Sequence, residues 1–472
     1  MTRRLLSLTA VALAATLAGC ALTPTYERPA APVAATFPSP AAEAGTAAAQ
    51  LPWADFIVDA RSQALVRAAL ANNRDLRVAV LNVEQARAAL GVQQADRLPT
   101  LNAGAAVSRS SASSSYTAGL QVTSFELDLF GRVKSLTEAA AARLLASDEA
   151  RRAVQLSLVT AVADADLVLR ADEVLIALTQ QVLASREASL KLVKLKFDAG
   201  AAGEPELRTS ESLVAAAQVS AAALERQRLQ HLNALVLLLG GPLPAGLPAA
   251  TPLQGVTYAD LPAGLPSDVL LQRPDVRQAE QLLVAANANI GAARAAFFPR
   301  ISLTGSLGFA STDLQSLFDQ SAWSFAPQLL MPLFDAGRNE ANLAAARVAR
   351  ELAVAQYEKS IQTAFREVAD ALATRATLGD QLRAQRTQAD AEQRRLALAE
   401  RLLAAGAASQ LDRLDAERSA LSARQAVIQL ELAQRQNALL LYRVLGGGSA
   451  VQEAATAASP TAAGSTTASA RS

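Results

Sequence analysis

The chain has 472 residues, of which 51% are hydrophobic and 4% aromatic, and its formal net charge is +1. A nearly neutral chain has no basic field for nucleic acid, so that class of partner is excluded. The only histidine, His231, has no Ser, Cys or acid motif around it. We therefore expect His231 to be a packing residue, and we expect no catalytic triad, no histidine-based metal site and no cofactor.

The first 19 residues have the pattern of a secretory signal. Arg3 and Arg4 precede an uncharged run that ends in the motif from Leu17 to Cys20. Small residues directly before a cysteine are what lipoprotein processing requires, so the sequence predicts removal of the signal and acylation of Cys20. Loss of the two arginines lowers the formal net charge from +1 to −1. Ala21, in place of an aspartate, favours sorting to the outer membrane of a Gram-negative cell.

Two further segments lack helical or strand periodicity. Residues 20–50 are rich in Pro, Ala and Thr and are expected to form an extended linker behind the lipid. Residues 449–472 contain mainly Ala, Ser, Thr and Gly and are expected to be disordered. After the signal, no run of about 18 apolar residues appears, so no transmembrane helix is expected. Any segment that crosses a membrane must then be β.

Strong helix formers with few breakers predict six long helices. They are expected over residues 60–97, 132–199, 204–239, 267–296, 338–405 and 410–445. The second has no Gly or Pro and would be about 100 Å long at 1.5 Å per residue. Gly200 and Gly406 follow the two longest helices, where a left-handed C-terminal cap favours glycine, and Ser409 can cap the next helix. Each glycine is therefore expected at the tip of a helical hairpin.

Two pairs of strands are predicted, each directly before one of the longest helices. The strands are expected at residues 101–108, 120–130, 301–309 and 323–334. Pro327 and Pro332 weaken the last strand and require a bulge or a sheet edge. Each strand is close to the length that crosses a bilayer, but four strands cannot close a pore without strands from other chains. The alternative is two soluble hairpins packed on a helical body.

Much of the chain is duplicated. The repeated residues include Asp75 and Asp275, Arg77 and Arg277, Gly91 and Gly291, and Pro99 and Pro299, and further on Gly131 and Gly337, Asp164 and Asp370, Gly200 and Gly406, and Gly240 and Gly446. The spacing is 200 residues up to Pro99 and 206 residues from Gly131 onward. The sequence therefore predicts two repeats, over residues 51–250 and 251–448, with an insertion in the second.

Several motifs carry a resemblance to a known family. They are the lipobox from Leu17 to Cys20, Leu129-Phe130-Gly131-Arg132, Arg273-Pro274-Asp275-Val276, Ala279-Glu280, the run from Ala286 to Pro299, and the run from Leu414 to Arg418. With these motifs, residues 53–447 resemble a TolC-type outer-membrane factor of the OprM-like (NodT-type) efflux lipoproteins.

The resemblance implies a mainly helical fold with membrane β-strands. In this family a homotrimer combines four strands from each internally duplicated protomer into one 12-stranded outer-membrane β-barrel, and the long helices into a periplasmic α-barrel. Such a trimer is a passive conduit without catalytic chemistry. It exports drugs or other small molecules from an inner-membrane transporter, here of the RND type, through a periplasmic adaptor, which would contact the hairpin tips at Gly200 and Gly406.

Two other functions stay open from the residues alone. One is a lipid-anchored coiled-coil scaffold that forms no channel, and the other is the outer-membrane component of a protein secretion system. Detergent dependence after removal of the lipid separates the scaffold from the conduit.

The family match also assigns a gate. Asp412 and Asp415 follow Gly406 by six and nine places and match the family's pair of gate aspartates. An i,i+3 pair shares one helix face, and a three-fold axis would place six carboxylates around one constriction. A ring of acids favours cations, and mutual repulsion is expected to raise the pKa values of some members. In the first copy Glu206 stands opposite Asp412 but Thr209 opposite Asp415, so the second hairpin is the better candidate.

The two aspartates have an alternative role, and this sequence departs from the family's pattern near the gate. Acidic residues are favoured at any helix N-terminus, so these carboxylates can also be a solvated helix start. Leu403 and Ala408 occupy the places of the Tyr and Arg that hold the gate shut in some family members. The sequence therefore leaves open how this gate is closed.

Overall fold

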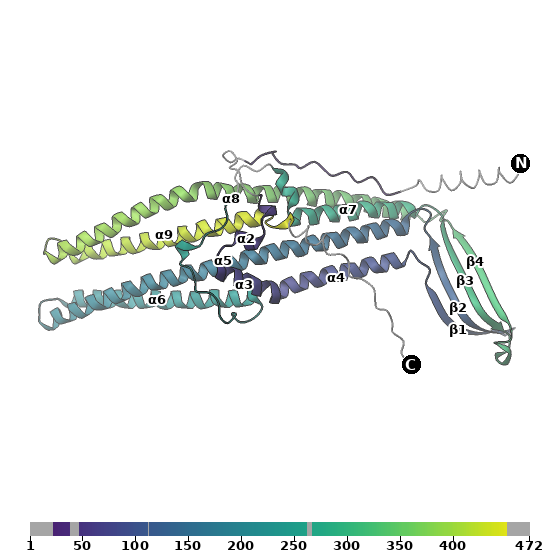
Figure 1. The fold of residues 1–472 in the computed structure, drawn as a ribbon, viewed down its shortest axis with the longest axis horizontal. Coiled ribbons are helices and arrows are strands. Elements are labelled where there is room, and N and C mark those ends of the chain that lie inside the picture. The colour runs from purple at the N-terminus through teal and green to yellow at the C-terminus, as the bar shows by residue number, and fades with distance from the viewer. Residues whose placement is uncertain (1–21, 38–46, 112, 262–266, 451–472) are drawn as a thin grey trace. The chain divides into compact units, whose positions relative to one another are not determined.

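The computed structural model describes residues 22–37, 47–111, 113–261 and 267–450 (Figure 1). The predicted signal peptide, Cys20 and residues 451–472 of the predicted disordered tail lie outside them. Ser449, the first residue of that tail, is described and is only 4% exposed. The tail was therefore predicted to begin too early.

Helices form most of the described chain. Their bounds are α2 (Trp53–Phe56), α3 (Ala60–Asn72), α4 (Arg74–Ala95), α5 (Arg132–Asp198), α6 (Glu204–Leu239), α7 (Pro274–Ala295), α8 (Arg338–Ala404) and α9 (Gln410–Val444), with 3-10 turns η1 (Ala48–Gln50), η2 (Leu253–Gly255), η3 (Ser267–Gln272) and η4 (Leu314–Ser316). The predicted bounds of α5, α6, α8 and α9 are confirmed to within one residue. No helix among the described residues is long and apolar enough to cross a membrane.

The predicted single helix over residues 60–97 is wrong, because the chain breaks at Asn73. The Asn73 backbone is extended, with φ −60° and ψ 132°. Its Oδ1 accepts a hydrogen bond from the Leu76 amide at 2.8 Å and caps α4, while its Nδ2 donates to the Leu238 carbonyl at 2.9 Å. The predicted helix over residues 267–296 also starts late, since α7 begins only at Pro274. Proline suits the first helical position and disfavours helix before it.

The four strands form one antiparallel sheet in the order β1-β2-β3-β4, as Figure 1 shows. Their bounds are β1 (Leu101–Arg109), β2 (Ser114–Leu127), β3 (Arg300–Ser311) and β4 (Ser321–Leu330). The second strand begins earlier than predicted and bulges at Ser124, where φ is 53°. Pro327 lies in β4, which pairs only with β3 in the described sheet, so of the two predicted possibilities, a bulge or a sheet edge, the structure shows the edge.

The sheet leaves both its outer edges and much of its apolar surface uncovered. Trp323 is 77% exposed, and Leu101, Val107 and Phe325 are each more than half exposed. Burying such side chains is what normally drives a soluble sheet to pack on its neighbours. The alternative of two soluble hairpins packed on helices therefore does not describe this sheet.

The described chain forms two compact units. The strand unit comprises the described residues within 22–32, 79–151 and 275–362, and the tip unit comprises those within 33–78, 152–274 and 363–450. Each unit contains parts of both predicted repeats. The boundary between the two sequence repeats therefore does not coincide with the boundaries of the two compact units.

A buried charge network joins α3 to α5 in the tip unit. Arg170 Nη2 lies 2.7 Å from Asp59 Oδ1 and 2.6 Å from Asp166 Oδ2, and all three side chains are buried. Arg170 Nη1 also donates to the Thr251 carbonyl at 2.8 Å. Burial by itself would raise the pKa of Asp59, but hydrogen bonds from Arg170, Ser62 and Thr251 hold that pKa well below its usual range.

His231 differs from its predicted role as a packing residue. The side chain on α6 is about one-third exposed, and its Nδ1 lies 2.6 Å from Oδ2 of the buried Asp172 on α5. The acid is 59 residues away in the sequence, so no local motif could indicate it. The pair connects the two helices of the first hairpin.

Candidate functional site

The two hairpin tips share one turn geometry. Gly200 and Gly406 both have left-handed backbones, with φ of 72° and 73°, which confirms the predicted caps. Gly200 N bonds Phe197 O at 2.9 Å and Gly406 N bonds Leu403 O at 3.0 Å. A Cβ on either glycine would meet nothing within 4 Å. Backbone conformation, and not lack of space, therefore favours glycine at the tips.

The helices that follow the tips begin differently. At α9, Ser409 and Asp412 form a capping box in which Asp412 N donates to Ser409 Oγ and Ser409 N donates to Asp412 Oδ2. This confirms the predicted cap at Ser409. At α6 the corresponding residue is Gly203, which has no side chain to accept a hydrogen bond from the amides of the first helical turn. The carboxylate of Asp412 is therefore a structural part of its helix start.

Asp415 lies one turn further along α9 and bridges two arginines. Arg395 Nη2 on α8 lies 2.5 Å from Asp415 Oδ2, and Arg418 Nη2 on α9 lies 2.7 Å from Asp415 Oδ1. Arg395 also pairs with Glu392 at 3.1 Å. The carboxylate thus connects the two helices of the second hairpin close to its tip.

In the single chain both carboxyls have lowered pKa values, and the rise expected from repulsion within a trimeric ring of acids stays a prediction about the trimer. The Ser409 hydroxyl and backbone amide hold the pKa of Asp412 below its usual range. The Arg395 guanidinium does the same for the pKa of Asp415. Hydrogen bonds and opposite charges favour the carboxylate form, and the sequence-based argument considered only repulsion between acids.

The first hairpin lacks this bridge. Glu206 is exposed and makes no side-chain hydrogen bond or ion pair within the described chain. Thr209, at the place of Asp415, donates to the Pro205 carbonyl at 2.7 Å. The structure thus supports the predicted inequality of the two tips, and it places Glu206 and Asp415 in different electrostatic surroundings.

Two arginines near the tips were missed by sequence reasoning. Arg395 stands 11 residues before Gly406 and Asp415 stands nine after it, so a helical hairpin folded at Gly406 brings the two together. Arg186 on α5 pairs with Glu417 on α9 at 3.0 Å and donates to the Leu213 carbonyl at 3.1 Å. This ion pair links the two hairpins within the tip unit. Pairing residues by their distance from the tip glycine could have found the first arginine.

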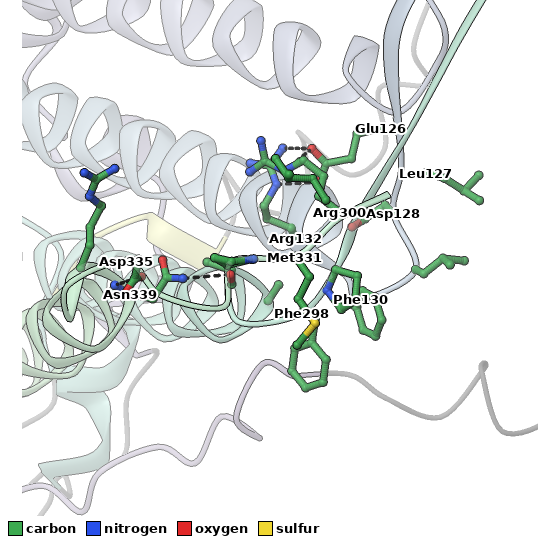
Figure 2. Close-up of a pocket in the computed structure, with 17 residues that line it drawn as sticks. Glu126, Leu127, Asp128, Phe130, Arg132, Phe298, Arg300, Met331, Asp335 and Asn339 are labelled. Atoms are coloured by element: carbon green, nitrogen blue, oxygen red, sulfur yellow. Dashed lines mark hydrogen bonds and ion pairs between the residues drawn. The ribbon is translucent and has the colours of Figure 1, made fainter. Parts of the chain in front are cut away.

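The strand unit contains a second polar cluster, where the strands meet the helices (Figure 2). Arg132 donates twice to Glu126, each time at 2.7 Å, and Arg300 Nε lies 3.4 Å from the same carboxylate. Phe130 and Phe298 stack with their ring centres 4.7 Å apart. These side chains line a cavity of about 420 Å³. The cluster fixes the end of β2 against the first turn of α5.

The duplication supplies a matched test of this junction. Arg338 is the second-copy equivalent of Arg132 and has no ion pair within the described chain, because Pro332 stands where the first copy has Glu126. We expect Arg132→Gln to lower the free energy of unfolding by about 1.5 kcal/mol, since it removes a charge-assisted double hydrogen bond. Arg338→Gln should leave it unchanged. Guanidinium unfolding followed by circular dichroism measures both, and equal effects would contradict the role of Arg132.

Comparisons with known proteins agree on one family. Residues 65–241 and 265–447 match the family model described as outer membrane efflux protein. The chain is 45% identical over 457 residues to the solvent efflux pump outer membrane protein SrpC of Pseudomonas putida, covering 93% of this chain and 97% of SrpC. It is 46% identical over 456 residues to the outer membrane protein OprJ of Pseudomonas aeruginosa, covering 93% and 95%.

Solved structures show the same fold. The open state of the Neisseria gonorrhoeae MtrE outer membrane channel superposes with a TM-score of 0.82 at 40% identity. The match covers 91% of this chain and 98% of that channel.

Proposed function

Because this chain belongs to the outer membrane efflux protein family, we propose that it is the trimeric outer-membrane channel of a tripartite efflux pump. It is an outer-membrane protein and not an enzyme. Its proposed role is to carry drugs, solvents or other small molecules passively to the exterior. The efflux names of its relatives favour this role over protein secretion.

The open sheet is the observation that supports the channel most strongly. Strands β1 and β4 each leave one edge unpaired in the described sheet. Unpaired backbone groups are too costly in a bilayer, so a sheet that crosses it must close. Three copies, joined β4 to β1, would close into one 12-stranded barrel and satisfy both edges. The exposed apolar side chains would then face lipid instead of water, which argues against the scaffold.

The hairpin tips are proposed as the gate and as the contact with a periplasmic adaptor. The turns at Gly200 and Gly406 are exposed and closed by backbone hydrogen bonds, which suits docking of a partner. Around a three-fold axis, Asp412 and Asp415 would form a ring together with the arginines that bind Asp415. The gate is thus proposed to be a ring of mixed charge, with Glu206 contributed by the first hairpin. The transporter beyond the adaptor is proposed to be of the RND type.

The N-terminus is proposed to carry the anchor. Removal of residues 1–19 would leave Cys20 to be acylated and inserted in the outer membrane. An anchor of one acyl chain is weak, whereas several acyl chains or a membrane-spanning barrel hold the protein firmly in the membrane.

Detergent dependence tests the channel against the scaffold. A Cys20→Ala variant with a conventional secretory signal carries no lipid, so only the barrel can hold it in the membrane. We expect this variant to stay in the membrane fraction and to need detergent for extraction as a trimer, as measured by light scattering with subtraction of the detergent mass. A soluble monomer or coiled-coil oligomer in the periplasmic fraction would overturn the proposed channel.

A further inference from the structure

The N-terminal segment from Leu22 to Arg28 lies along α7 and is hydrogen-bonded over its whole length. The bonds are Arg294 Nη1 to Leu22 O at 3.0 Å, Thr23 Oγ1 with Ser135 Oγ at 3.0 Å, Asn287 Nδ2 to Pro24 O at 2.7 Å, Tyr26 OH to Glu280 Oε1 at 3.1 Å, and Arg28 Nε to Glu280 Oε1 at 2.7 Å. We call this segment the N-terminal strap. All these residues belong to the strand unit.

Glu280 shows that the strap is a specific partner of α7. Its side chain is only 9% exposed. Among the described residues, the hydrogen bonds to its carboxylate all come from the strap, one from the Tyr26 hydroxyl and two from the Arg28 guanidinium. A buried carboxylate without partners is strongly unfavourable. The position of Glu280 therefore makes sense only with the strap in place.

Gly291 gives the strap the space that it needs. A Cβ on Gly291 would overlap Thr23 Oγ1 and would lie 2.6 Å from Ser135 Oγ and 2.9 Å from Thr23 Cα. Gly91, the first-copy equivalent on α4, has nothing within 4 Å of a Cβ. Glycine is kept in both copies, but among the described residues only Gly291 has another chain segment lying against it.

The polar residues that hold the strap exist in one copy only. At the 200-residue offset, Glu280, Asn287 and Arg294 correspond to Val80, Arg87 and Gln94. Val80 has no acceptor for the Tyr26 and Arg28 donors, and Arg87 and Gln94 differ from Asn287 and Arg294 in length and in donor geometry. The two copies have thus diverged at the positions that contact the strap, within the motif that also carries the family resemblance.

We propose that Glu280, Asn287, Gly291 and Arg294 form a docking track that fixes the strap and so sets where the lipidated N-terminus leaves the protein. The proposal rests on the acylation of Cys20 proposed above. Arg294 lies in the last turn of α7, shortly before β3 begins. Cys20 is two residues from Leu22, a reach of about 7 Å at most. The track thus places the acyl chains beside the helix-facing ends of the strands. There they can enter the bilayer leaflet that surrounds those ends.

A disulfide across the track tests the docking. Thr23→Cys and Ser135→Cys replace two hydroxyl groups that touch, so a disulfide needs little movement. We expect rapid cross-linking by copper phenanthroline in the full-length protein, because acylated Cys20 offers no competing thiol. Adding Gly291→Ala should slow cross-linking at least tenfold, whereas Gly91→Ala should not. Both changes raise helix propensity equally, so the difference reports the strap.

The outcomes separate the track from the proposed function. Equal cross-linking rates with Gly291→Ala and Gly91→Ala, or no disulfide in the parent, would overturn the track. The mass of the N-terminal peptide reports acylation independently. Suppose the disulfide forms fast in protein whose N-terminal peptide carries no acyl group, and equally fast in a Cys20→Ala background. That result would overturn the proposal that the track positions a lipid anchor. Loss of trimers in detergent would contradict the channel while the cross-link still reports the strap.

Discussion

Replacing Arg170 with methionine is expected to lower the free energy of unfolding by about 3 to 5 kcal/mol, because it breaks a buried charge network by removing one partner. The side chains of Asp59 and Asp166 stay buried after the change and lose their shared guanidinium. Methionine keeps the length of the side chain, so the loss comes mainly from the charge. Thermal unfolding in detergent, followed by circular dichroism, measures the effect.

An exposed ion pair provides the control for this prediction. Arg228 pairs with Glu225 on the surface of α6. Exposed pairs contribute little because water already solvates both charges. Arg228→Met should therefore leave the unfolding temperature unchanged. A similar loss of stability in both variants would show that the network around Arg170 has no special role.

The same network predicts how stability depends on pH. The pKa of Asp59 is lowered in the folded chain, so the folded state binds fewer protons than the unfolded state. Its contribution is fully present above the unfolded pKa of about 3.9 and is lost as the pH falls below that value. Arg170→Met should remove this contribution, so the loss of stability caused by the variant should be smaller in acid than at neutral pH.

Asp415→Asn is expected to shift the ion selectivity of the channel toward anions. The change removes the carboxylate that Arg395 and Arg418 share and leaves both guanidinium groups without it. Three copies would thus turn a mixed ring into a more positive one. The reversal potential across a salt gradient in planar bilayers measures the shift.

The double variant Arg395→Gln with Asp415→Asn is the matched control, since it removes one charge of each sign. Its reversal potential should lie close to that of the parent protein. Because the pKa of Asp415 is lowered by Arg395, the selectivity of the parent should also stay constant from neutral pH down to about pH 4. An unchanged reversal potential in Asp415→Asn would exclude Asp415 from the constriction.

Local chemistry explains which helix ends were predictable. Gly200, Gly406 and Ser409 favour a turn or a cap whatever surrounds them, so the tips could be placed from the sequence. The break at Asn73 could not, because its amide is held by the Leu238 carbonyl, 165 residues away. A single asparagine in a helical pattern costs too little to predict a break by itself.

The strand boundaries likewise divide into those set by local residues and those set by distant contacts. The start of β2, from Ser114 to Gly119, has little apolar alternation, and its extended backbone is fixed by pairing with β1 and β3. The strap was predicted only as an extended linker. Its partners, such as Glu280 and Asn287, are visible in the sequence as a family motif. Their role, however, depends on contacts between residues more than 250 positions apart in the sequence.

The charges at the proposed gate were identified, but not their partners. Asp412 and Asp415 were identified through the family resemblance, whereas the bridge to Arg395 exists only once α8 and α9 lie side by side. Sequence reasoning therefore placed both acids on one helix, but it considered only repulsion between acids and not the arginines that lower the pKa of Asp415 in the single chain. Side-chain pairing between helices was the missing information.

Single-channel recording of the unmodified protein tests the conduit most directly. The purified trimer, reconstituted in planar bilayers, is predicted to give discrete conductance steps, because three open sheets close into a pore that the hairpin tips restrict. The steps should be absent from a monomeric fraction of the same preparation. A trimer that inserts in the bilayer and never conducts, even with both Arg186→Ala and Asp415→Ala to loosen the tips, would contradict the account.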